Sequence, residues 1–235
     1  MAGSFLMSGC THYFYLPNSH NVPLLHEKND ARLSLGSYTG TDGSTSASGF
    51  EFQGSYAVTN KVGIMASYMH ASGSSGEEYG RGAYADVGAG YFTAGKSKHF
   101  VFETFGVIGY GGAENRFSNF ATCKVNFTKV FVQPTLGYKS KNFDAAFSWR
   151  LASLHYASFG FNGQLTEADM NGIRTLETNP DFILSEPGIT LRFGFEDLKI
   201  QVQTGTSGSL SVPTQSRLYY SIGAFFTLNG AVTKK

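Results

Sequence analysis

The residues of this sequence best suited to catalysis are histidines that stand near carboxylates. A histidine beside a carboxylate can act as a general base for a water molecule or a serine hydroxyl. The candidates are His70, Glu77, Glu78, His155 and Asp169. They form no local motif, and six histidines spread through a chain with polar loops will stand near acids by chance. We therefore expect no catalytic residue, and a hydrolase or protease is the weakest alternative function.

Metal, nucleotide and nucleic-acid sites are not indicated either. No pair of Cys or His residues has the spacing of metal ligands, and the glycine-rich stretch at 106–112 lacks the Lys-Ser/Thr that ends a phosphate-binding loop. A formal net charge of +1 gives no signal for nucleic-acid binding. We expect no cofactor, no metal site and no nucleic-acid partner.

The elements that would position any functional side chain are strands. In the stretch 49–70, Phe50, Phe52, Tyr56 and Val58 alternate with small or polar residues, and a Thr-Asn-Lys turn leads into a second alternating run. Successive side chains of a strand point to opposite faces, so each of these runs has one apolar face. The stretch predicts a β-hairpin.

Ten such strands can be followed along the chain. Their expected spans are 31–39, 49–59, 62–72, 81–93, 99–112, 127–139, 143–157, 186–195, 198–207 and 217–228. The connections alternate between short and long, with both chain ends on the short-turn side, which is typical of outer-membrane barrels. We therefore predict an all-β, up-and-down antiparallel transmembrane barrel of about ten strands, with eight strands as an alternative. A soluble β-barrel with its aromatic side chains inside is the competing fold.

The two faces of the predicted strands differ in polarity. One face is apolar throughout and is expected to meet lipid, with Ala85 and Leu191 among its members. The opposite face places six charged side chains in the lumen: Arg32, Glu51, Asp86, Glu103, Arg150 and Arg192. Buried ions are costly unless they are paired, so we expect these groups to pair and to close the lumen. Near the long loops, an aromatic girdle is expected from Tyr38, Tyr68, Tyr110, Phe127, Tyr156 and Tyr219.

The longest connection, at 158–185, is the best candidate for an outer binding surface. Its stretch 166–177 begins with a Thr-x-x-Asp capping pattern and predicts a short helix. Its apolar residues are Phe159, Phe161, Met170, Ile173 and Leu176. They could pack over the barrel mouth or dock a partner, and the sequence does not choose between the two.

The N-terminal region divides into two parts. Apolar residues followed by Ser8, Gly9 and Cys10 resemble a bacterial lipobox, so we expect 1–9 to be a residual signal segment and Cys10 to be lipidated. In the alternative, Cys10 is an ordinary cysteine. Residues 10–30 are expected to be a linker, 31–228 the transmembrane barrel, and 229–235 a C-terminal tail.

The linker carries a motif of its own. Its residues are Tyr15, Pro17, Asn18, Asn21, Val22, Pro23, Leu24, Glu27 and Lys28. With the lipobox, this pattern resembles small outer-membrane β-barrel lipoproteins of Bacteroidota that have no assigned reaction; this chain has Asn29 and Asp30 where that pattern has a Gly-Glu pair. The resemblance implies a location in the outer membrane more than an activity. We expect both termini in the periplasm, outer-membrane lipids as surroundings and other outer-membrane proteins as partners.

Two functions follow as expectations. The first is that of a structural or accessory subunit of a larger outer-membrane complex, such as barrel-assembly or transport machinery. The second is that of a narrow pore for small solutes, because an eight-stranded interior is filled by side chains and only sixteen or more strands leave a wide aqueous channel.

Overall fold

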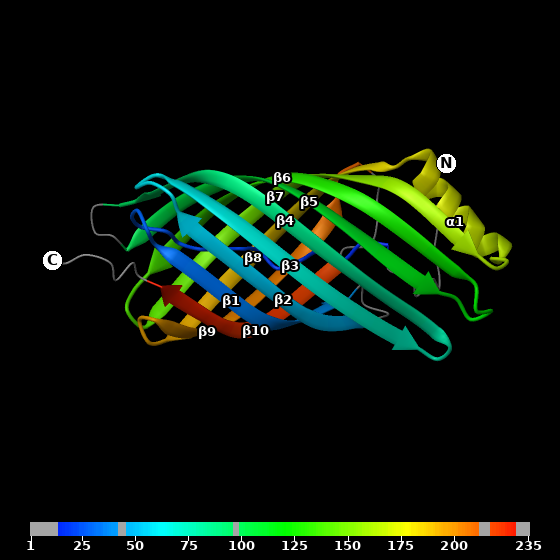
Figure 1. Cartoon of the computed structure of the whole chain (residues 1–235), viewed down its shortest axis with the longest axis horizontal. Coiled ribbons are helices and arrows are strands. Elements are labelled where there is room, and N and C mark those ends of the chain that lie inside the picture. Colours follow the sequence, from blue (N-terminus) through cyan, green and yellow to red (C-terminus); the bar gives the residue numbers. More distant parts are fainter. Residues whose placement is uncertain (1–13, 42–45, 96–98, 212–216, 229–235) are drawn as a thin grey trace, which may run out of the picture.

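The computed structural model describes residues 14–41, 46–95, 99–211 and 217–228. Ten antiparallel strands form a closed barrel in which every strand pairs with its neighbours in sequence and β1 pairs with β10 (Figure 1). The strands are β1 (Ala31–Thr41), β2 (Ser46–Ala57), β3 (Val62–Ser75), β4 (Glu78–Ala94), β5 (Phe100–Arg116), β6 (Thr122–Lys139), β7 (Phe143–Asn162), β8 (Asp181–Gly194), β9 (Leu198–Ser209) and β10 (Arg217–Leu228). The predicted ten-stranded up-and-down barrel is confirmed.

All strands except β10 extend further at the long-loop end than the sequence pattern indicates. Strand β7 continues to Asn162 and β6 already begins at Thr122. The long loop expected after β3 is a turn of Gly76 and Glu77, where Gly76 has a φ of +59°. Spanning strands need only about 9–11 residues. The extra residues therefore project beyond the membrane, where a lipid-facing alternation is no longer needed.

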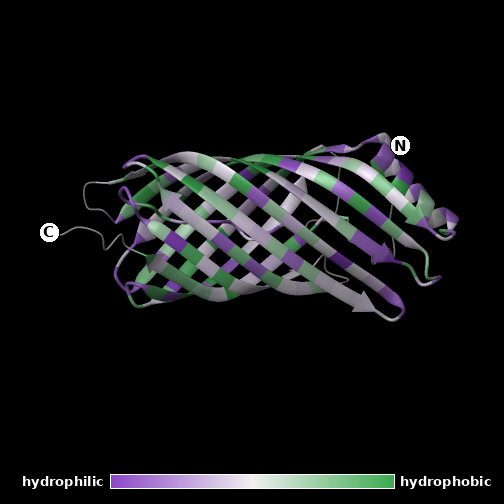
Figure 2. Cartoon of the chain, viewed as in Figure 1, coloured by the Kyte–Doolittle hydropathy of each residue, from purple (hydrophilic) through white to green (hydrophobic). Residues whose placement is uncertain are grey.

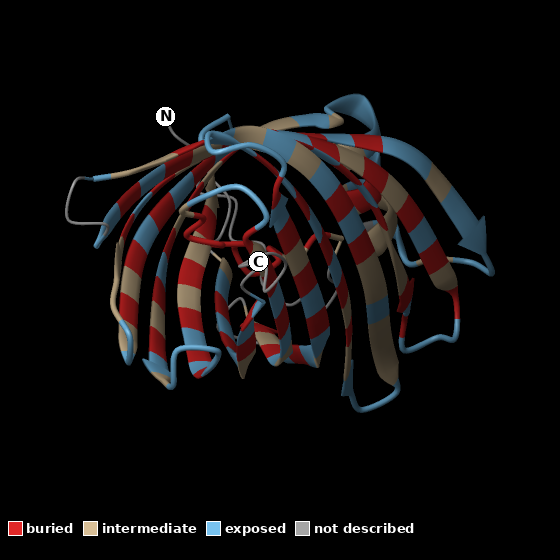
Figure 3. Cartoon of the chain, turned by 60° about the vertical axis from the view of Figure 1, so that its left-hand side comes forward, coloured by how far each residue is buried: buried red, intermediate tan, exposed pale blue. Residues whose placement is uncertain are grey.

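The exterior of the barrel is apolar, whereas its interior holds charged and polar side chains beside an apolar cluster. Exposed and buried residues alternate along the strands (Figure 3), and hydropathy alternates with them (Figure 2). Outward-facing Leu35 and Phe147 are 56% and 52% exposed, whereas inward-facing Arg150 and Gln133 are 0% exposed. This pattern is that of a transmembrane barrel and the reverse of that of a soluble one. Among the described residues, no helix is long and apolar enough to cross a membrane.

Two prolines interrupt the pairing of neighbouring strands. The ladder between β6 and β7 passes from Val132 to Thr135 without Gln133 and Pro134, and the ladder between β8 and β9 passes from Ser185 to Gly188 without Glu186 and Pro187. Proline has no N–H to donate to a ladder. The interruptions are local, because pairing resumes in the same register on their far side; the ladder between β6 and β7 shifts its register elsewhere, between Asn126 and Phe127.

The lumen is occupied by the chain's own N-terminal segment. Residues 14–25, which we call the plug, run along the inside of the barrel as an extended tube without helix or strand (Figure 1). Phe14 packs near Phe117 and Ile173 at the long-loop end, whereas Leu228 pairs with Ala31 at the short-turn end. The described chain therefore begins at the long-loop end, because residues 14–25 pass through the lumen. The expectation that both chain ends lie on the short-turn side concerns residues outside the described ones and stays a prediction.

Candidate functional site

The plug contacts a group of buried ionic side chains near the middle of the barrel. Lys129 in β6 donates from Nζ to Glu186 Oε2 at 2.7 Å and to Tyr15 Oη at 2.6 Å. The hydroxyl of Tyr15 donates to the other oxygen of Glu186 at 2.6 Å. Lys129 and Glu186 are both 0% exposed. A buried ion pair is tolerated only where additional hydrogen bonds satisfy its charges, and here the plug supplies one of them.

Arg150 in β7 binds the plug further along the chain, at Asn18 and Ser19. Its Nη1 donates to the backbone and side-chain oxygens of Asn18, both at 3.0 Å, and its Nη2 donates to the carbonyl of Ser19 at 3.0 Å. Its Nε donates to Gln133 Oε1 at 2.8 Å. The guanidinium also lies over the ring of Phe131, 4.6 Å from the centroid. One arginine therefore binds two consecutive residues of the plug, using the fixed geometry of its donors.

The wall binds the main chain of the plug at every residue from 17 to 22. The carbonyl of Pro17 accepts from Tyr38, those of Asn18 and Ser19 from Arg150, that of His20 from Gln203, that of Asn21 from Gln133, and that of Val22 from Arg192. A buried carbonyl without a partner would cost free energy. The wall thus replaces the hydrogen bonds that an extended chain would otherwise make to water.

At the short-turn end, a carboxylate holds the plug through two consecutive backbone amides. The N–H groups of Leu24 and Leu25 donate to the two oxygens of Glu103, at 3.1 and 2.6 Å. Leu24 adopts a φ of +49°, which is rare for a bulky side chain. Successive backbone N–H groups that point toward one anion form a concave anion-binding site. The unusual backbone conformation of Leu24 therefore belongs to the contact with Glu103 at the inner end of the plug.

The charges nearest the short turns pair among themselves. Lys199 Nζ lies 2.6 Å from Asp144 Oδ1, and Arg192 Nη1 lies 3.9 Å from Asp144 Oδ2. Arg32 pairs at 2.8 Å with Asp30, the residue just before β1. Asp30 also accepts from the backbone N–H of His26. These contacts fix the chain between the plug and the first strand.

The six predicted lumen charges all lie buried inside the barrel. They do not pair with one another as expected, because the plug lies between them: Glu103 binds plug amides, Arg150 and Arg192 bind plug carbonyls, and Asp86 accepts from Asn18. Glu51 accepts from Ser221. Sequence reasoning missed Lys129, Asp144 and Glu186. The alternation of the strands could have identified them, because each lies an even number of positions from a residue of the same strand that was predicted to face inward.

Most of the linker motif lies in the plug. Tyr15, Pro17, Asn18, Asn21 and Pro23 are buried in the lumen. Glu27 and Lys28 are exposed at the short-turn end, where the N–H of Lys28 donates to Asn60. Residues 14–25 are thus not a linker outside the barrel but a packed part of its interior, where His20 is 1% exposed.

Most of the aromatic residues expected in the outer girdle face the lumen instead. Tyr38, Phe127, Tyr156 and Tyr219 are all buried, and of the six only Tyr68 and Tyr110 are on the exterior. The inward residues form an apolar cluster around the outer end of the plug, with Tyr15 packed edge-on against Phe127 at 5.7 Å. The prediction was wrong for these four residues because it was based on their nearness to the long loops. It did not consider whether the alternation along each strand points the side chain inward or outward.

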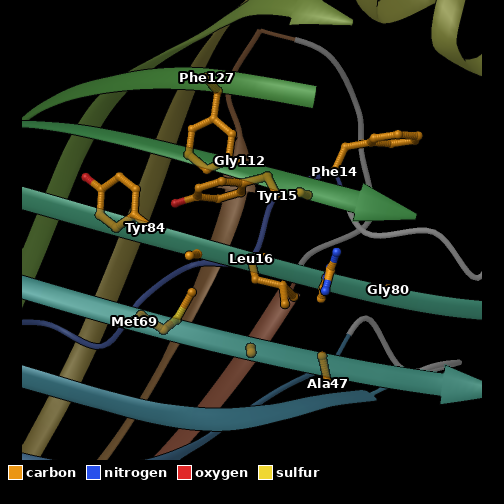
Figure 4. Close-up of a pocket in the computed structure, with 14 residues that line it drawn as sticks. Phe14, Tyr15, Leu16, Ala47, Met69, Gly80, Tyr84, Gly112 and Phe127 are labelled. Carbon is orange, nitrogen blue, oxygen red and sulfur yellow. The ribbon is translucent and has the colours of Figure 1, made fainter. Parts of the chain in front are cut away.

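A hollow open to solvent lies beside the outer end of the plug (Figure 4). Phe14, Tyr15 and Leu16 form one side of it, and Ala47 and Met69 face them from the barrel wall. The strands around it carry mainly glycine and alanine on this side. The lumen is therefore less completely filled at its outer mouth than at its centre.

The predicted outer binding loop folds over this mouth. Helix α1 (Glu167–Thr178) begins after the N-cap Thr166, whose side chain accepts from the N–H of Asp169. Ile173 is 1% exposed and packs against Phe117 and Cys123. Phe159 and Leu176 pack on the lumen cluster, whereas Phe161 is exposed and Met170 is half-buried. Of the two roles left open by the sequence, packing over the mouth is the one observed.

The residues considered for catalysis do not converge on a cavity. His155 and Asp181 are in contact at 2.8 Å, but both are exposed on the outer surface of the barrel. His70 stacks on Phe50 on the same exterior, and neither it nor His155 lines the hollow. Cys10, expected to be lipidated, lies outside the described residues, as do 1–9 and the tail 229–235.

Comparison with known proteins gives the fold. The translocator domain of the autotransporter NalP from Neisseria meningitidis matches with a TM-score of 0.53 and 11% sequence identity, over 85% of this chain and 88% of that chain. This chain has the fold of an outer-membrane β-barrel. No family model and no curated protein matches the sequence.

Two further solved structures are similar at lower scores. The outer membrane protease OmpT from Escherichia coli has a TM-score of 0.45 and 8% identity, over 85% of this chain and 96% of that chain. Ail, the attachment invasion locus protein of Yersinia pestis, has a TM-score of 0.38 and 14% identity, over 86% and 99%.

Proposed function

We propose that this protein is a non-conducting outer-membrane barrel that acts as a structural or accessory subunit of a larger outer-membrane assembly. The observation that supports the proposal is the plug. Side chains from across the wall bind each carbonyl from Pro17 to Val22, and Arg150 and Gln133 beside them are fully buried. A lumen filled in this way has no use as a passage for solutes, so the exterior, the rims and the loops are left to carry the function.

The narrow pore is the second candidate, and it requires the plug to leave the lumen. Leaving would break the hydrogen bonds of Tyr15 to Glu186 and of two plug amides to Glu103. Removing one partner of a buried charged group costs several kcal/mol. This cost favours the closed barrel over a pore that opens and closes through thermal motion alone.

The experiment that tests the accessory role is purification of the tagged protein from its native outer membrane in a mild detergent. Mass spectrometry then identifies the proteins that co-purify in stoichiometric amounts. A tagged, unrelated barrel of similar size, expressed at the same level, is the control. A fixed set of outer-membrane companions supports the proposal, whereas recovery of the barrel alone contradicts it.

A further inference from the structure

The plug runs through the lumen from Phe14 at the long-loop end to Leu25 at the short-turn end. We propose that the barrel holds the chain preceding Phe14 at the outer face of the membrane, so that the lumen serves to present an N-terminal extension on the cell surface. The inference rests on the proposed location in the outer membrane, with the long loops outside and the short turns in the periplasm. It concerns a display function that the accessory role does not include.

The first support is where the two ends of the segment lie. At the short-turn end, the N–H of Asn29 donates to the carbonyl of Ala57 at 2.9 Å, and β1 begins two residues later at Ala31. At the long-loop end, Phe14 packs beside Phe117 and beneath α1. The segment between them therefore crosses the whole barrel from one rim to the other.

The second support is the way the wall binds the segment. Its donors reach the carbonyls of the plug, which every residue has, so an extended chain of any sequence could present these acceptors at the same positions. Side chains then fix the register: Tyr15 on Lys129 and Glu186, and Asn21 on the carbonyls of Gly54 and Ala66. The wall thus combines contacts that any extended main chain could make with contacts that fix the register of this segment.

The third support is the lack of space for a return path. Around the plug, Arg150, Gln133 and Lys129 are 0% exposed, and Gln203 is 1% exposed. A second pass of the chain through the lumen would have to displace these buried groups. The chain that precedes Phe14 is therefore expected to leave by the long-loop mouth, past the hollow that Phe14 and Leu16 line (Figure 4).

The test is the accessibility of an epitope tag inserted directly before Phe14. Two matched variants carry the same tag elsewhere: one after Gln164, in the long loop before α1, and one after Lys141, in the short turn between β6 and β7. Intact Gram-negative cells and permeabilised cells that express each variant are stained with the antibody. Retained heat-modifiable migration in electrophoresis shows that each variant forms its barrel.

The proposal predicts that the tags before Phe14 and after Gln164 stain intact cells equally, while the tag after Lys141 stains only permeabilised cells. Staining of the tag before Phe14 only after permeabilisation would overturn it. So would staining of the turn tag and not of the loop tag on intact cells, since the barrel would then be inserted the other way. None of these results depends on which proteins co-purify, so failure here and failure of the accessory role are distinguishable.

A second measurement covers the case in which the tag prevents folding. The variant Asn21→Cys/Ser67→Cys, in a Cys10→Ala/Cys123→Ala background, places two cysteines where the native side chains lie 3.4 Å apart. If the segment crosses the lumen in cells, oxidation forms an intramolecular disulfide that changes migration in a denaturing gel, and Asn21→Cys alone does not. Absence of that disulfide in a folded barrel would overturn the proposal.

Discussion

At the scale of single residues, the central feature is the buried contact of Lys129, Glu186 and Tyr15. Its members are far apart in sequence and come from β6, β8 and the plug. Exposed ion pairs contribute little because water screens them, whereas a buried charge that loses its partner is left uncompensated. This buried ionic group therefore couples the barrel to the plug, beside the contacts of Arg150, Arg192 and Glu103.

The variant Lys129→Met tests this coupling. It leaves the Glu186 carboxylate without its closest cation, so we expect the free energy of unfolding to fall by about 3–5 kcal/mol. The measurement is urea unfolding in lipid vesicles. The exposed pair of Arg81 and Glu114 is the control, and Arg81→Gln should leave the midpoint nearly unchanged. An equal effect of the two variants would show that the buried contact is not special.

The variant Glu103→Gln tests the short-turn end of the plug. The amide side chain keeps one acceptor for the N–H groups of Leu24 and Leu25 and loses the other, together with the charge. Hydrogen bonds to charged groups contribute about 1.5–3 kcal/mol. We expect faster hydrogen exchange at these two amides, with little change at the amides of β10. Unchanged exchange at Leu24 and Leu25 would contradict the assigned role of Glu103.

At the scale of elements, α1 covers the outer mouth and buries the thiol of Cys123. Cys123 lies at the outer end of β6, beyond the apolar band, and burial raises the pKa of its thiol to about 11. Only the thiolate reacts readily. In a Cys10→Ala background, we expect maleimide to label Cys123 slowly at pH 8 until the protein is unfolded.

The variant Ile173→Asp should release this protection, because the charged side chain cannot remain packed on Phe117 and Cys123. Labelling of Cys123 is then expected to become fast while the barrel remains heat-modifiable. The variant Glu167→Ala, in the first turn of the same helix, is the control and should leave the labelling rate low. Slow labelling in Ile173→Asp would mean that α1 does not control access to the thiol.

The strands themselves are tested on their lipid face. Ala85 is exposed on the exterior of β4, and an arginine near the bilayer midplane costs about 2–4 kcal/mol. We expect Ala85→Arg or Leu191→Arg to lower the free energy of unfolding in vesicles by that amount, and Ala85→Leu to leave it unchanged. An arginine without effect at both positions would mean that this face does not meet lipid.

The strands were predictable because alternation is a local property of the chain. The inward position of Glu103 could be assigned even though its strand is apolar on both faces. The helix N-cap at Thr166 could be predicted from Thr166 and Asp169 alone. The plug could not be found in this way, because an extended segment without a period shows no pattern. Its partners are also remote: Tyr15 and Glu186 are 171 positions apart. The motif residues were noticed, but their contacts require the closed ring of strands.

At the scale of the whole molecule, the central arrangement is a barrel whose lumen is occupied by its own N-terminal segment. The apolar exterior, the bound carbonyls of the plug and the helix over the mouth are all consistent with a lumen that serves as a packed core. In such a barrel the interior stabilises and positions the chain, and the surfaces outside it are available to partners.

The most direct test is single-channel recording from the purified protein in planar bilayers, with a variant that lacks residues 14–25. We expect that the intact protein shows no conductance and that the deletion variant shows defined conductance steps. The oxidised variant Asn21→Cys/Ser67→Cys in the Cys10→Ala/Cys123→Ala background is the control and should remain closed. Conductance steps of equal size and frequency in the intact protein and the deletion variant would contradict closure of the lumen by the plug.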